Sequence, residues 1–101
     1  MVIIAKSAII KFADKHPSTI VPLMEWNDIV TEADWANVND VKNTFNSADY
    51  IGNERFVFNI KGNHYRLVAA VVFKIRTVYI KFIGTHAEYD KINVKTIEHK
   101  P

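Results

Sequence analysis

Residues 55–90 read RFVFNIKGNHYRLVAAVVFKIRTVYIKFIGTHAEYD, and the fold is decided in this stretch. Within it, apolar side chains recur at every second residue in three runs, which is the period of a strand with one face on a core. The positions on this face are Phe56, Phe58 and Ile60, then Tyr65, Leu67, Ala69, Val71 and Phe73, then Val78, Ile80 and Phe82. The stretch predicts three short antiparallel strands, followed by a helix-like segment that carries His86, Tyr89 and Asp90.

The turn between the first two runs sets their register. Gly62-Asn63 is a two-residue hairpin signal, because both residues tolerate positive φ. Closing this turn makes three cross-strand pairs, Lys61 with His64, Asn59 with Arg66, and Phe58 with Leu67.

The connection around residues 74–75 sets the register of the third run. It must hold an even number of residues if Leu67 and Ile80 are to share a face, because a slip of one residue inverts a strand. The pairs that follow are Arg66 with Ile83 and Val68 with Lys81. We therefore expect a polar cluster at one corner of the sheet, made of Asn59, Lys61, His64, Arg66, Lys81 and His86.

Length and composition predict one compact domain spanning residues 1–101. A hydrophobic content of 49% with 24% charged residues excludes an intrinsically disordered chain. No apolar run approaches the about 18 residues that predict a membrane span, and the N-terminal MVIIAKSAIIKF does not resemble a signal peptide. The chain has no cysteine, which removes disulfides and thiol nucleophiles. A cytoplasmic location fits these observations best.

Charge is distributed unevenly along the chain. Residues 1–50 hold four lysines and seven acidic residues, a net charge of −3, whereas residues 51–101 hold nine lysines or arginines and four acidic residues, a net charge of +5. Because the positive half coincides with the predicted strands, it favours an anionic partner for the sheet. Solvated charges that only confer solubility explain the pattern equally well.

Three helical segments precede the strands. Residues 5–15 and 19–31 have apolar residues at helical spacing, and residues 37–45 predict a short third helix. Residues 1–4 predict a strand and residues 46–53 a loop. Further expectations for the helices are a first helix ended by Pro17, a second one capped by Ser18, and an inward stripe of Ile20, Leu23, Met24, Asn27 and Val30. Helices covering one face of an antiparallel sheet make the fold class α+β.

The other face of the predicted sheet is apolar at one end. Val68, Ala70 and Val72 share this face with Arg66. Such a surface must be covered, and either the C-terminal segment or a partner chain could cover it. The last residues of the chain are expected to fray.

The residues left for chemistry are an arginine, a histidine and a tyrosine. Such a set suits cleavage of an RNA phosphodiester by the substrate's own 2′-hydroxyl, which needs a base, an acid and cations for the charge on phosphorus. His86 can take either proton role near neutral pH, Arg66 can hold two phosphate oxygens, and Tyr89 lies one helical turn from His86. Taken singly, His86 and Tyr89 are more often surface and packing residues. No glycine-rich phosphate loop or histidine pair at metal-ligand spacing is present, so no metal or cofactor is expected.

The motifs FNIKGNHYRLVAAVVF and VYIKFIGTHAEYDKI, with NSADYIGNERFVFNI upstream, resemble the HigB branch of the RelE-like toxins of bacterial type II toxin–antitoxin systems. The likeness is strong over residues 36–92 and looser in the N-terminal helices. It implies a RelE-like fold, in which two to three N-terminal helices pack on one face of a small, mainly antiparallel sheet and RNA binds the other face. It also implies a metal-independent, ribosome-dependent endoribonuclease, an mRNA interferase that inhibits translation.

The partners implied by the resemblance are mRNA in the ribosomal A site, the ribosome, and a HigA-type helix-turn-helix antitoxin. Operator DNA would be contacted only through this antitoxin. The motifs place the catalytic positions at Arg66, His86 and Tyr89, and leave open which residue is the acid and which the base. We also expect RNA contacts from Asn59, Lys61, Asn63, His64, Lys74, Arg76, Lys81 and Asp90.

Two other functions are compatible with the residues. One is a non-catalytic inhibitor on the same scaffold, like the ParE group that targets DNA gyrase, although a histidine and a tyrosine after the last strand argue against it. The other is an RNA-binding module without activity, in which the lysines and arginines of the strands contact phosphates.

Overall fold

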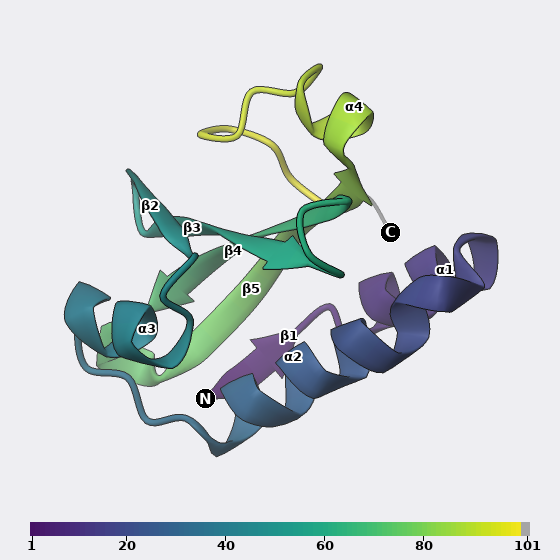
Figure 1. Cartoon of the computed structure of the whole chain (residues 1–101). Helices are drawn as coiled ribbons and strands as arrows, with labels where there is room; N and C mark the ends of the chain where they lie inside the picture. The colour runs from purple at the N-terminus through teal and green to yellow at the C-terminus, as the bar shows by residue number, and fades with distance from the viewer. Residues whose placement is uncertain (100–101) are drawn as a thin grey trace.

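The computed structural model describes residues 1–99 and shows a five-stranded sheet. The elements are β1 (Val2–Ile4), α1 (Ser7–Lys15), α2 (Ile20–Glu32), α3 (Val38–Thr44), β2 (Asp49–Gly52), β3 (Arg55–Ile60), β4 (Tyr65–Val72), β5 (Thr77–Thr85) and α4 (His86–Tyr89). The strand order is β1-β5-β4-β3-β2, antiparallel throughout except that β1 runs parallel to β5. In Figure 1, α1 and α2 lie on one side of the sheet, and α4 with the C-terminal segment lies on the other. The predicted α+β class is confirmed.

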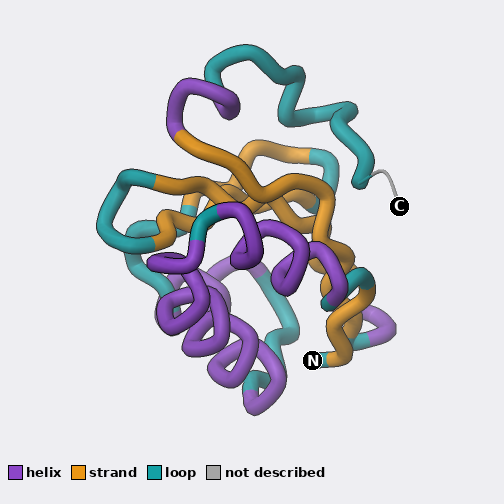
Figure 2. Tube along the Cα trace, turned by 90° about the vertical axis from the view of Figure 1, so that its right-hand side faces the viewer, coloured by secondary structure: helices purple, strands orange, loops and turns teal. Residues whose placement is uncertain are grey.

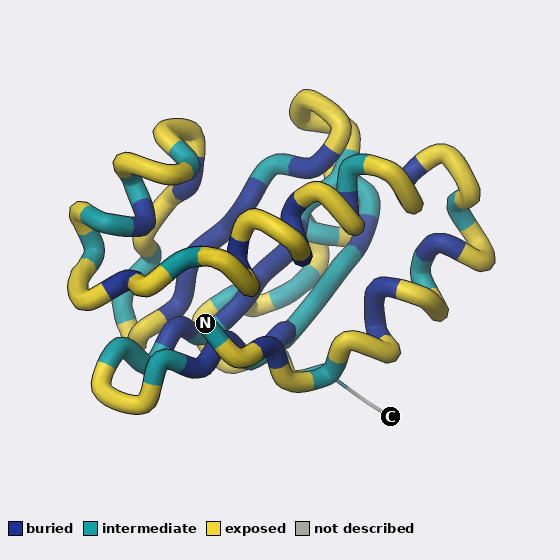
Figure 3. Tube along the Cα trace, turned by 90° about the horizontal axis from the view of Figure 1, so that it is seen from below, coloured by how far each residue is buried: buried dark blue, intermediate teal, exposed yellow. Residues whose placement is uncertain are grey.

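The helices bury their apolar stripes against the sheet, and Figure 3 shows their exposed residues turned outward. In α2 the buried stripe differs from the predicted one. Trp26 is 2% exposed, whereas Ile20 and Met24 are each 37% exposed. Both stripes fit a period of 3.6 residues, and burial of the large indole removes more apolar surface from water. The residues that α2 buries are Leu23, Trp26, Asn27 and Val30.

The link between α1 and α2 is a 3₁₀ turn, Pro17–Thr19, rather than a capped start. The predicted cap at Ser18 is wrong, because helical geometry already runs through this turn into α2 and no side chain caps it. The Thr19 hydroxyl donates instead to the His16 carbonyl at 2.7 Å.

Residues 46–53, which were predicted as a loop, contain the strand β2. Asp49 pairs with Val57 and Tyr50 with Phe56. The turn formers in this stretch argue against a strand locally. However, β3 would otherwise leave a row of backbone groups unpaired at the sheet edge, and β2 satisfies them.

The first hairpin has the predicted register. Asn59 pairs with Arg66 and Phe58 with Leu67. The positive φ angles fall on Lys61 (53°) and Gly62 (68°), one residue earlier than expected. The pairing therefore stops at Ile60 and Tyr65, and residues 61–64 form the turn.

The second hairpin follows the predicted register only halfway. Its connection holds four residues, and the pairing is as predicted from Val72–Thr77 to Ala69–Ile80. A β-bulge between Val68 and Ala69 then inserts one extra residue on β5. The pairs beyond the bulge are Val68 with Phe82, Leu67 with Ile83, Arg66 with Gly84, and Tyr65 with Thr85. Arg66 does not lie beside Ile83, and Val68 does not lie beside Lys81.

The bulge exchanges two side chains between the faces of the sheet. Ile83 packs against the core, while Phe82 shares the opposite face with Val68. Alternation cannot reveal this exchange, because an inserted residue inverts the parity of everything after it.

The core joins the helices to the sheet through Phe58, which is 1% exposed. Its ring packs edge-on against Trp26 of α2, with centroids 5.5 Å apart, and against Phe45 after α3, at 5.2 Å. Such pairs add to the free energy gained from buried area. Trp35 is also buried, so both tryptophans are packing residues.

The C-terminal segment covers part of the outer face of the sheet, the face opposite α1 and α2 (Figures 1 and 2). Beneath it, Val57 and Val68 are 2% and 0% exposed. The Asn53 side chain donates to the Lys95 carbonyl at 3.3 Å, and Arg55 donates to two further tail carbonyls. The sequence allowed either the C-terminal segment or a partner chain as the cover, and the C-terminal segment covers these residues. Residues of this segment are hydrogen-bonded to the sheet as far as Glu98. Fraying is expected for the last residues, of which Lys100 and Pro101 lie outside the described residues. No helix within residues 1–99 is long and apolar enough to cross a membrane.

Candidate active site at the end of the sheet

The helix α4 is fixed to the end of β5 by a capping box. The Glu88 backbone N–H donates to the Thr85 hydroxyl at 3.1 Å, and the Thr85 backbone N–H donates to the Glu88 carboxylate at 2.8 Å. Two N–H groups that would otherwise lack partners at the helix start are thereby satisfied. Because the strand passes into the helix without a loop, His86 and Tyr89 have defined positions relative to β4.

Arg66 lies beneath Tyr89. The guanidinium carbon of Arg66 is 5.4 Å from the centroid of the Tyr89 ring, which is cation–π geometry. The Nε atom of Arg66 is buried and has no hydrogen-bond partner within residues 1–99. A buried donor without a partner is costly. Arg66 as a whole is only partly buried, so an anionic ligand would bind the outer nitrogens of the guanidinium and not Nε.

His86 connects α4 to the turn of the first hairpin. Its backbone N–H donates to the His64 carbonyl at 3.2 Å. Its ring Nδ1 lies 3.2 Å from the Asp90 carboxylate, and both side chains are about half exposed. A carboxylate at Nδ1 favours the tautomer that carries its proton there, which leaves Nε2 free to exchange a proton with a substrate.

Gly84, the register partner of Arg66, leaves the space that this arrangement needs. A Cβ atom at Gly84 would come within 2.4 Å of the Phe82 ring and 3.2 Å of Glu88. Any other residue would therefore displace Phe82 or push against α4. The sequence offered no signal for this role.

The structure brings several of the predicted site residues together. Arg66, His86, Tyr89 and Asp90 form the corner, with Asn59 paired to Arg66 and the turn residues Lys61, Asn63 and His64 exposed next to it. We call these eight residues the sheet-end site.

Three predicted RNA contacts lie apart from the sheet-end site. Lys74 and Arg76 belong to the connection between β4 and β5, at the opposite end of β4, where Arg76 Nε bonds the Asp34 carboxylate at 2.7 Å. Lys81 stands at the bulge, and its Nζ lies 2.6 Å from the Glu98 carboxylate. The bulge removes Lys81 from the corner, since it shifts the register on which that expectation depended.

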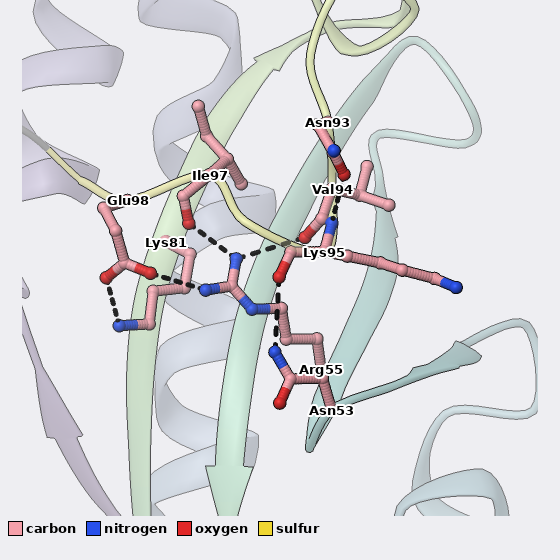
Figure 4. A network of polar contacts seen from close by, with 8 residues as sticks. All are labelled: Asn53, Arg55, Lys81, Asn93, Val94, Lys95, Ile97 and Glu98. Atoms are coloured by element: carbon pink, nitrogen blue, oxygen red, sulfur yellow. Dashed lines mark hydrogen bonds and ion pairs between the residues drawn. The ribbon is translucent and has the colours of Figure 1, made fainter.

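Arg55, at the start of β3, was not among the predicted site residues. Its side chain is 6% exposed and, within residues 1–99, bonds only to the C-terminal segment, through the carbonyls of Val94 and Ile97 and the Glu98 carboxylate (Figure 4). A signal was present. A charge on a strand face next to Val57 must find a partner, because a buried ion is stable only when it is paired.

Glu98 is shared by two cations. One carboxylate oxygen accepts from Lys81 and the other from Arg55. These hydrogen bonds, from Lys81 first and Arg55 second, lower the pKa of Glu98 below its ordinary value of 4.5. The carboxylate is therefore ionised at neutral pH.

The remaining surface offers little that could hold a cofactor. A shallow groove of about 410 Å³ lies between α1 and β5, lined by Ala8, Lys11, Phe12, Asp14, Lys15, Ile83 and His99. Next to it, His16 stacks on Phe12 with ring centroids 4.4 Å apart. Within residues 1–99, no three histidine or acidic side chains are grouped closely enough to bind a metal ion.

Fold and site together define a small α+β protein with an Arg–His–Tyr corner at one end of its sheet. The family model described as HigB_toxin, the RelE-like toxic component of a toxin–antitoxin system, matches residues 20–92. The chain belongs to this family, so the resemblance inferred from its motifs is confirmed.

Curated relatives span nearly the whole chain. A protein of Escherichia coli O6:H1 named mRNA interferase HigB is 28% identical over 102 residues and covers 99% of each chain. The mRNA interferase toxin HigB of Escherichia coli K12 is 31% identical over 93 residues, covering 89% of this chain and 88% of its own. The mRNA interferase HigB of Shigella flexneri is similar to the same extent.

Proposed function

We propose that this chain is the toxin of a toxin–antitoxin pair and acts as a ribosome-dependent endoribonuclease on mRNA. The observation that carries the proposal is the placement of Arg66 under Tyr89, with His86 on the same short helix. Membership of the HigB toxin family supports it, as do the interferase names of the relatives.

The reaction that suits these groups is an intramolecular transesterification. The substrate's 2′-oxygen attacks phosphorus and loses its proton to a base, and the 5′-oxygen leaves and gains a proton, which yields a 2′,3′-cyclic phosphate. His86 Nε2 supplies one of the two proton transfers. Arg66 stabilises the added negative charge on the non-bridging oxygens, because its charged guanidinium is held against the Tyr89 ring before substrate binds.

Tyr89 holds the Arg66 guanidinium from above through its ring. The ring also restricts the arginine to one position, which lowers the entropy lost when phosphate binds. The turn residues Lys61, Asn63 and His64 extend the polar surface outward from the corner, where they can contact the RNA backbone. Lys74 and Arg76, at the far end of β4, would contact a more distant part of the RNA or of the ribosome.

Partners follow from this function. The substrate is mRNA in the ribosomal A site, and the ribosome contributes to positioning it. A HigA-type helix-turn-helix antitoxin would neutralise the toxin and carry it to operator DNA. Such a reaction takes place in the cytoplasm.

The test is cleavage of mRNA on translating ribosomes by the purified chain. The wild type should cut within codons, and Arg66→Ala and His86→Ala should each lower the rate by about 10²- to 10⁴-fold. Lys11→Ala, on the exposed face of α1, serves as a matched loss of positive charge and should leave the rate unchanged.

Two results would contradict the proposal. Wild-type activity in the Arg66→Ala/His86→Ala double variant would exclude the mechanism. Salt-sensitive RNA binding with no cleavage on ribosomes would instead support a non-catalytic RNA-binding module.

A further inference from the structure

The outer face of the sheet holds a second pair of cations besides the sheet-end site. Arg55 on β3 and Lys81 on β5 extend from two strands that flank β4, and both reach the carboxylate of Glu98 (Figure 4). The Arg55 side chain is 6% exposed and that of Lys81 is 20% exposed, whereas that of Glu98 is 59% exposed. The two cations are therefore largely buried, and the carboxylate contacts them from the solvent side.

The two nitrogens of the Arg55 fork have separate partners. Nη1 donates to the carbonyls of Val94 at 3.1 Å and Ile97 at 2.5 Å, while Nη2 donates to Glu98. The Glu98 side chain could swing outward without disturbing the bonds of Nη1. Arg55 would stay in place with Nη2 unpaired, and a largely buried charge with a missing partner attracts another anion strongly.

The contacts around Glu98 match those a phosphodiester would accept. One oxygen of the carboxylate bonds Arg55 and the other bonds Lys81 at 2.6 Å. The two non-bridging oxygens of a phosphate group present the same pair of acceptors, and arginine binds both anions in the same way.

This cation pair lies on the face that carries the sheet-end site. Arg55 begins β3, and Asn59, four residues further along the strand, is the register partner of Arg66. The rise of a strand makes that separation about 13 Å, so one RNA strand can reach both positions. The family match ends at residue 92, before the segment that carries Glu98.

We propose that Arg55 and Lys81 form a phosphate-binding position for the RNA backbone, which Glu98 occupies in the free protein and leaves when RNA binds. This inference rests on the proposed function, because it concerns the same RNA substrate. Glu98 thereby competes with the RNA phosphate for the two cations and lowers the affinity of the chain for RNA.

The experiment measures binding of a short single-stranded oligoribonucleotide, made uncleavable by 2′-deoxy substitution, to the isolated full chain by fluorescence anisotropy over a range of salt. Glu98→Gln removes the competing charge and should raise affinity about two- to fivefold, the effect of one exposed ion pair. Glu54→Gln, in the exposed turn before β3, makes the same charge change and should raise affinity less.

Lys81→Met should lower the slope of log affinity against log salt by about 0.7, the value for one phosphate contact on a single strand. In the Lys81→Met/Glu98→Gln double variant, the gain from the glutamine should be lost. Lys11→Met on α1 is the matched control and should leave the slope unchanged.

Equal affinity of Glu98→Gln and the wild type would overturn the inference, as would the same gain in the Lys81→Met background or no binding by any variant. These results can be told apart from failure of the proposed function. If Glu98→Gln binds more tightly but no variant cuts mRNA on ribosomes, the phosphate position stands and the enzymatic function falls. If the wild type cuts mRNA and Glu98→Gln does not bind more tightly, the function stands and the phosphate position falls.

Discussion

Two parts of the Tyr89 side chain, its ring and its hydroxyl, can contribute to the proposed site. Its ring lies over the Arg66 guanidinium, and its hydroxyl could transfer a proton. The two roles depend on different parts of the side chain. Because the geometry that the structure defines is that of the ring, we assign Tyr89 mainly to positioning Arg66.

Substitution separates these roles. Tyr89→Phe keeps the ring and the cation–π contact, so its rate of mRNA cleavage should stay within about fivefold of the wild type. Tyr89→Ala loses the ring and the contact, so its cleavage rate should fall further. Single-turnover cleavage on ribosomes measures the difference. A loss of about 10²-fold or more in Tyr89→Phe would instead assign the hydroxyl a proton-transfer role.

Arg55 illustrates a different property of single residues. A charged residue at the start of a strand, followed by Phe56 and Val57, does not reveal its partner by its sequence context. Here the carboxylate partner is 43 residues away in the sequence. The charge could be recognised as needing a partner, but only the folded chain shows that Glu98 and the tail carbonyls supply it.

At the scale of elements, the short helix α4 depends on its cap more than on its length. Four residues are too few for a helix to be stable alone, so the Thr85–Glu88 box and the contact of His86 with His64 keep it in place. The position of the proposed acid or base therefore depends on a threonine that does not itself take part in the reaction.

A matched pair of cap variants tests this dependence. Thr85→Ala and Asn37→Ala each remove a side chain that accepts an N-terminal backbone N–H, at α4 and at α3 respectively. Each should lower the free energy of unfolding by about 1 kcal/mol, as measured by urea denaturation. Only Thr85→Ala should also lower the cleavage rate at a temperature where both variants are folded. Equal rates in the two variants would show that α4 does not need its cap for activity.

For the whole molecule, the two faces of the sheet are closed by opposite ends of the chain. Helices α1 and α2 cover one face, and the C-terminal segment covers part of the other (Figure 1). This segment is short and irregular, so its bonds to Arg55 and Asn53 hold it over Val57 and Val68. The helix α4, which carries two residues of the proposed site, connects the end of β5 to this segment.

Ending the chain after Ile92 should therefore destabilise the whole fold. Val57 and Val68 would be exposed and Arg55 would lose its partners, which should lower the free energy of unfolding by about 1–3 kcal/mol. Urea denaturation monitored by tryptophan fluorescence measures the change. Arg55→Met in the full chain removes the anchor but leaves the segment and should cost less. A truncated chain as stable as the wild type would show that the segment does not stabilise the outer face.

The sequence by itself determined the class of the fold, the three helices, the first hairpin and its register, because these depend on local periodicity and turn chemistry. It also placed Arg66, His86 and Tyr89 at one corner, since Arg66 lies near the start of its strand and the other two follow the end of the next strand. The family pattern in the same stretch agrees with this placement.

Tertiary structure alone decided the bulge in β5, the strand β2 and the cover of the outer face. Each depends on pairing or packing between segments that are distant in the sequence, and no local pattern encodes which of several acceptable partners is chosen. The bulge moved Lys81 away from the corner and placed Gly84 there instead. The C-terminal segment then joined Lys81 to Arg55 through Glu98, which is the second cation pair on the face that carries Arg66.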